Sequence, residues 1–115
     1  MKAKIKSVDL SLPIGVFEYT PERENCFSIW MTFTVGKIDS QGEDYFRLQV
    51  CSPNWLKENA PGMSWGRHML LVDRYRPQEI IEFVDRYVSS FDERDWIGLA
   101  GKIARVMEWE FEDYS

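Results

Sequence analysis

The side chains best suited to chemistry in this sequence are its single histidine and its two cysteines. His68 could act as a general base toward a nucleophilic Cys51. However, no cysteine or carboxylate lies at metal-ligand spacing from His68, and the residues flanking Cys51 match no catalytic elbow. We therefore interpret His68 as a hydrogen-bonded histidine of the core or its rim, and Cys51 as a packing residue. One alternative stays open, a small enzyme or ligand-binding domain with a pocket around Arg67, His68 and Cys51.

Motifs that bind phosphates, dinucleotides or catalytic zinc are missing from the sequence. It contains no G-x-x-x-x-G-K, no G-x-G-x-x-G and no H-E-x-x-H. We expect a protein that is not an enzyme and that carries no cofactor and no metal ion.

Acidic residues alternate with aromatic ones near the C-terminus, at Glu108, Glu110 and Glu112. In a strand, alternate carboxylates project on one side with backbone positions roughly 6–7 Å apart, which is wide for a compact metal site. Two other interpretations are a solvated edge that discourages strand aggregation and a negative docking surface for a basic partner.

The composition indicates one folded domain spanning residues 1–115. The chain is 44% hydrophobic and 15% aromatic, which argues against disorder. No apolar run approaches the roughly 20 residues that span a bilayer, and no secretory signal follows the basic N-terminus. We therefore expect a cytoplasmic protein without membrane contact. A net charge of -5 disfavours direct nucleic-acid binding and is compatible with a basic partner.

Strict alternation from Cys26 to Val35 predicts a strand, and residues 45–51 read as its returning partner in a hairpin. One face of the hairpin is apolar. The register that this face requires places Cys51 opposite Ser28 or Trp30, too far from Cys26 for a disulfide. The other face is polar and aromatic, and its members are Trp30, Thr32, Thr34, Tyr45, Arg47 and Gln49.

The remaining elements follow from similar patterns. Residues 2–12 predict a strand with a bulge near Ser7, and Ser52 predicts the N-cap of a short helix at 53–59. The unbroken apolar run from Met69 to Val72 predicts a central strand covered on both faces, with His68 inside it. A helix is expected from Pro77 to Phe91, a second with Asp92 as N-cap, and a final strand over 108–114. The predicted fold class is α+β, an antiparallel or mixed sheet of about five strands with two main helices packed on one face.

Several blocks of the sequence, in order and over nearly the whole chain, resemble the immunity protein 8 family. They are residues 1–6 (MKAKIK), 46–56 (FRLQVCSPNWL), 65–75 (WGRHMLLVDRY), Trp96 and 109–114 (WEFEDY). Members of this family are small cytoplasmic proteins encoded beside toxins of bacterial polymorphic-toxin and contact-dependent growth inhibition systems. The resemblance implies an α+β protein that binds and neutralises a cognate toxin domain without catalysis, and it transfers no site residues.

We expect the toxin to bind one of two surfaces. One is the open hairpin face, with Trp30, Tyr45, Arg47 and Gln49; the other is the acidic strand, with Glu108, Glu110 and Glu112. The acidic charge would suit a basic nuclease toxin, because complementary charge accelerates encounter. The sequence leaves the oligomeric state open.

Overall fold

In the part of the chain that the structure describes, a mixed five-stranded sheet and three helices form the fold, which confirms the predicted α+β class. The computed structural model describes residues 1–60 and 62–112. In chain order the elements are β1 (Ala3–Leu10), β2 (Ser28–Lys37), β3 (Asp44–Cys51), α1 (Pro53–Asn59), β4 (Met69–Leu71), α2 (Pro77–Ser89), α3 (Trp96–Ile103) and β5 (Glu108–Trp109).

The hairpin of β2 and β3 is the centre of the sheet. Its antiparallel register pairs Ser28 with Cys51 and Phe33 with Phe46, as the alternation predicts, and both cysteines are free thiols. β1 pairs with the other edge of β2, and its register shifts between Ile5 and Ser7, which confirms the predicted bulge.

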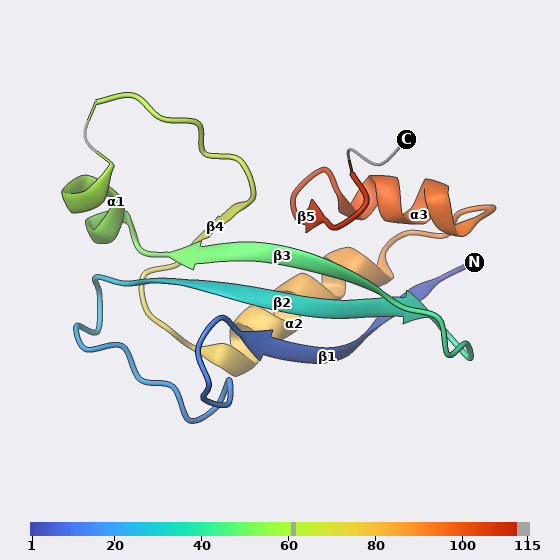
Figure 1. Cartoon of the computed structure of the whole chain (residues 1–115), viewed down its shortest axis with the longest axis horizontal. Coiled ribbons are helices and arrows are strands. Elements are labelled where there is room, and N and C mark those ends of the chain that lie inside the picture. Colours follow the sequence, from blue (N-terminus) through green and yellow to red (C-terminus); the bar gives the residue numbers. More distant parts are fainter. Residues whose placement is uncertain (61, 113–115) are drawn as a thin grey trace.

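The core lies between this sheet and the two longer helices. Figure 1 shows α2 behind the sheet, so that the opposite face of β1, β2 and β3 is turned toward the viewer. The fully buried side chains Met31, Phe33 and Phe46 of the hairpin join Val88 of α2 and Leu99 of α3 in one cluster. Alternation of apolar and polar residues in β2 and β3 therefore separates a packed face from an open one.

The prediction of a central strand at 69–72 is wrong. β4 is a three-residue strand on the outer side of β3, to which it pairs in parallel, and its Leu71 is 55% exposed. The run is apolar throughout because Leu70 and Val72 pack against the core while Met69 lines an apolar groove at the edge. His68 lies before this strand, in a backbone conformation with φ of 64°.

Two predictions about the C-terminal third are also wrong, namely the N-cap of the last helix and the length of the final strand. Asp95, and not Asp92, caps α3 by accepting a hydrogen bond from the Gly98 amide. Asp92 instead pairs with the N-terminal amine of Met1 at 2.7 Å.

The final strand is shorter than predicted. β5 contains only Glu108 and Trp109, which pair with Arg47 and Phe46 of β3. The Glu110 amide still donates to the Tyr45 carbonyl at 3.1 Å, and the chain then turns. Asp113 and Tyr114, which the prediction also included, lie outside the described residues.

No helix in the described part of the chain combines the length and the apolarity needed to cross a membrane.

Candidate protein-binding face

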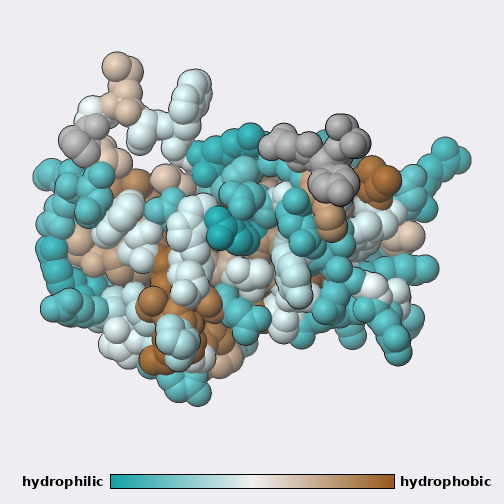
Figure 2. Space-filling view, in the orientation of Figure 1, coloured by the Kyte–Doolittle hydropathy of each residue, from teal (hydrophilic) through white to brown (hydrophobic). Residues whose placement is uncertain are grey.

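The predicted residues of the hairpin lie together on the open face of the sheet. Cross-strand pairing places Trp30 opposite Gln49, and Thr32 opposite Arg47. Tyr45 is 50% exposed, and Arg47 is also exposed. Figure 2, which views the molecule from this side, shows a surface of mainly hydrophilic and intermediate side chains over the strands. This face therefore offers polar and aromatic groups to a partner without a deep cavity.

Arg47 occupies the middle of a short chain of contacts on this face. Its guanidinium carbon lies 4.6 Å from the centroid of the Trp30 ring, which is a cation–π distance. On the other side, Nε of Arg47 donates to Oε1 of Glu108 at 3.0 Å. Both contacts restrict the Arg47 side chain before any partner arrives.

The same ion pair joins the two surfaces that the sequence predicts as separate. β5 pairs with β3 in a register that sets Glu108 beside Arg47. The open hairpin face and the residues around β5 thus form one continuous surface, which we call the β3–β5 face and define by Trp30, Tyr45, Arg47, Gln49, Glu108 and Glu110.

The three glutamates do not project from one side of a strand, because β5 ends at Trp109. Oε1 of Glu110 accepts a hydrogen bond from the Tyr45 amide at 2.8 Å. Glu112 pairs with Arg67, just before β4. Each carboxylate therefore has its own neighbour, and a shared metal site is not built from them; the described residues contain no group of three metal-ligating side chains.

Gln49 is held by two hydrogen bonds of different kinds. Its side-chain amide donates to Oγ of Ser28 at 2.9 Å, and its backbone amide donates to the carbonyl of His68 at 2.9 Å. The first bond fixes the side chain over the hairpin, and the second attaches the segment before β4 to β3.

Sequence reasoning missed the residue that anchors β5. The carboxylate Oδ2 of Asp44, at the start of β3, accepts hydrogen bonds from the indole Nε1 of Trp96 at 2.7 Å and of Trp109 at 3.0 Å. Asp44 precedes Trp96 by 52 positions and Trp109 by 65 positions in the chain, so no local pattern could have revealed the contact.

The three residues of the alternative pocket, Arg67, His68 and Cys51, differ in burial and in the contacts that they make. Cys51 is fully buried, and burial raises the pKa of its thiol, which suppresses the nucleophilic thiolate. Arg67 is exposed and pairs with Glu112. Nε2 of His68 is buried without a hydrogen-bond partner in the described part of the chain, and lies 3.9 Å from Oε2 of Glu112. The expected hydrogen bond to that nitrogen is therefore absent among these residues.

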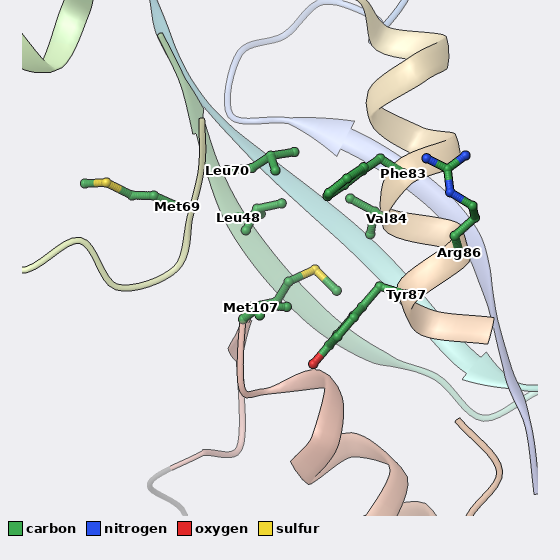
Figure 3. Close-up of a pocket in the computed structure, with 9 residues that line it drawn as sticks. Leu48, Met69, Leu70, Phe83, Val84, Arg86, Tyr87 and Met107 are labelled. Atoms are coloured by element: carbon green, nitrogen blue, oxygen red, sulfur yellow. The ribbon is translucent and has the colours of Figure 1, made fainter. Parts of the chain in front are cut away.

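An apolar groove of about 450 Å³ does exist, at the edge where β4 faces α2. Figure 3 shows Leu48, Leu70, Val84 and Met107 around it, with the Arg86 guanidinium directed away from them. The Tyr87 hydroxyl donates to the Lys102 carbonyl at 2.7 Å. The groove can accept apolar groups, but its lining brings together no acid, base or nucleophile, and it includes none of the three residues of the alternative pocket.

The comparison with protein families gives one result. The model of the immunity protein 8 family matches residues 3–114, nearly the whole chain. The chain therefore belongs to the immunity protein 8 family, which confirms the resemblance seen in the sequence. No curated protein and no solved structure matches this chain significantly.

Proposed function

We propose, with membership of the immunity protein 8 family as the premise, that this protein binds a cognate bacterial toxin domain and neutralises it by protein–protein contact. It would do so in the cytoplasm of the producing cell and without catalysis, as part of a polymorphic-toxin or contact-dependent growth inhibition system. The observation that supports the proposal best is the β3–β5 face, where a constrained Arg47 lies between Trp30 and Glu108.

The residue types on this face are those that dominate binding energy in protein complexes. Tryptophan, tyrosine and arginine are enriched among interface hot spots. The cation–π contact and the ion pair hold Arg47 in place, so little of its side-chain entropy remains to be lost on binding. Protection of a cell calls for an affinity of about 1 nM, or roughly -12 kcal/mol, from an interface of roughly 800 Å² on each partner.

The charge of the face favours a basic toxin, such as a nuclease domain. In the described part of the chain, carboxylates outnumber guanidinium groups along β3 and β5, and the whole chain carries a net charge of -5. An electrostatically steered encounter can reach roughly 10⁸–10⁹ M⁻¹s⁻¹ at low salt, against about 10⁵–10⁶ M⁻¹s⁻¹ without steering. Steering matters for an immunity protein because free toxin acts until it is captured.

The experiment is a measurement of association rates for the double variant Glu108→Gln/Glu110→Gln. Glutamine keeps the size of the side chain and an oxygen that can accept the hydrogen bonds from Arg47 and from the Tyr45 amide. We expect association with the toxin domain encoded by the adjoining gene to slow about tenfold at low salt, with a weaker dependence on ionic strength.

A matched control removes the same charge from the helical side. Glu79 and Glu82 are exposed on α2, away from the β3–β5 face, and Glu79→Gln/Glu82→Gln lowers the net negative charge equally. If both double variants slow association to the same extent, only the total charge matters. If Glu108→Gln/Glu110→Gln leaves the on-rate at low salt unchanged, these two residues do not belong to the binding surface.

A further inference from the structure

The segment between α1 and β4 exposes two large apolar side chains almost completely. Met63 is 100% exposed and Trp65 is 95% exposed. Figure 1 shows this segment extending away from the sheet, and Figure 2 shows the corresponding projection at the upper left. Single exposed apolar residues are common on protein surfaces, but a projecting tryptophan beside a projecting methionine is typical of an interaction site.

Trp65 differs from the other four tryptophans in its lack of burial. Trp30, Trp55, Trp96 and Trp109 are all at least partly buried, and Trp96 and Trp109 pack against the core. The Trp65 side chain, in contrast, adds nothing to the packing of the fold at 95% exposure. Its large apolar surface stays in contact with water in the free protein.

The projecting segment is fastened where it leaves and rejoins the fold. On the α1 side, the Ala60 amide donates to the Leu56 carbonyl at 2.8 Å. On the β4 side, Arg67 pairs with Glu112, and the His68 carbonyl accepts from the Gln49 amide. Trp65 therefore lies two residues before Arg67, whose side chain is held by Glu112. This restraint reduces the conformational entropy that the segment loses when a partner binds Trp65.

We infer that Trp65, with Met63 beside it, is the anchor that inserts into an apolar pocket on the toxin domain; this inference rests on the proposed function. Arg67, two residues after Trp65, contacts Glu112, so the base of the segment lies beside this acidic residue. The pocket would be lined by aliphatic or aromatic side chains and bordered by basic ones.

Charge favours a protein toxin over two other occupants. A net charge of -5 opposes adsorption to anionic lipid, which attracts basic segments. It also opposes close self-association of two identical chains. Neither kind of charge repulsion opposes the binding of a basic toxin.

The test compares Trp65→Ala with the wild-type protein in binding to the toxin domain encoded by the adjoining gene. We expect the dissociation constant to rise about 30-fold or more, as for a hot-spot residue, and mainly through faster dissociation. Met63→Ala should weaken binding several-fold. The unfolding midpoints of both variants should match that of the wild type, because neither side chain is buried. Ile97→Ala, at a site on α3 that is 74% exposed, is the control and should bind like the wild type.

The outcomes separate this inference from the proposed function. Wild-type binding that Trp65→Ala leaves unchanged would overturn the anchor and leave the proposed function standing. A wild-type protein that does not bind the toxin domain would overturn both. Sedimentation that shows a wild-type dimer lost on Trp65→Ala would assign the residue to self-association instead, and Trp65-dependent binding to phosphatidylglycerol vesicles would assign it to a membrane; either result refutes the anchor.

Discussion

Asp44 is the side chain on which the position of β5, and hence of Glu108 beside Arg47, should depend most. Its carboxylate accepts the indole hydrogens of Trp96 and Trp109, which connects the start of β3 with α3 and β5. We predict that Asp44→Ala strongly destabilises the protein, because both indole donors lose a charged acceptor in a partly buried place.

The magnitude follows from the two hydrogen bonds. A hydrogen bond to a charged group contributes about 1.5–3 kcal/mol, and both rings are only half-buried, so we take the lower value for each and expect a loss of about 3 kcal/mol for Asp44→Ala. Asp44→Asn keeps a neutral oxygen that can accept from both indoles, and its loss should be about 1 kcal/mol. For a chain of this length the total free energy of unfolding is on the order of 5–15 kcal/mol, so the alanine variant removes a large part of it.

Urea unfolding followed by far-ultraviolet circular dichroism is the appropriate assay, because tryptophan fluorescence would report the changed indole environment itself. The neighbouring exposed carboxylate Glu43 supplies the control, and Glu43→Ala should change the free energy of unfolding by less than about 0.5 kcal/mol. An Asp44→Ala protein as stable as the wild type would refute the reasoning, and so would an asparagine variant as unstable as the alanine one.

Two further predictions concern stability elsewhere in the fold. Ser52→Ala should cost about 2 kcal/mol in urea unfolding, because the buried Oγ accepts from the amides of Phe27 at 3.1 Å and Trp55 at 3.3 Å; equal stability would show that water replaces it. Burial raises the pKa of Tyr75 to about 12, and its hydroxyl donates to the Val16 carbonyl at 2.6 Å. Because the folded pKa lies above the ordinary value of 10.0, this contribution is complete below pH 10 and disappears as the pH rises toward 12. After a discount for solvent screening of the partly buried ring, this rise corresponds to about 1 kcal/mol. Unfolding midpoints between pH 9 and 12 should therefore fall more steeply for the wild type than for Tyr75→Phe, and parallel curves would contradict the assignment.

Local patterns in the sequence predicted the central hairpin, its register and the helix that begins at Pro77. Alternation in β2 and β3 reports directly which side chains face the core, because successive residues of a strand point to opposite faces. The Ser52 cap and the bulge near Ser7 were also readable, since each depends on a few neighbouring residues. The resemblance to the immunity protein 8 family was also readable from the sequence, and the family model matches residues 3–114.

Features that depend on contacts between distant residues could not be read in this way. The apolar run at 69–72 looks the same in a central strand and in an edge strand beside an apolar groove, and only the pairing with β3 distinguishes them. The alternation after Glu108 suggested a long strand, but regular pairing with β3 ends at Trp109, and the Tyr45 amide beyond it donates to the Glu110 side chain instead.

The sequence by itself determined three features: an aromatic and polar hairpin face, an acidic segment near the C-terminus and a high content of tryptophan. Tertiary structure alone decided that Arg47 and Glu108 meet, that Asp44 holds two tryptophans, and that Trp65 projects into solvent. The reason is physical, since periodicity records the geometry of adjacent residues, whereas contacts and exposure depend on which remote segments the folded chain brings together.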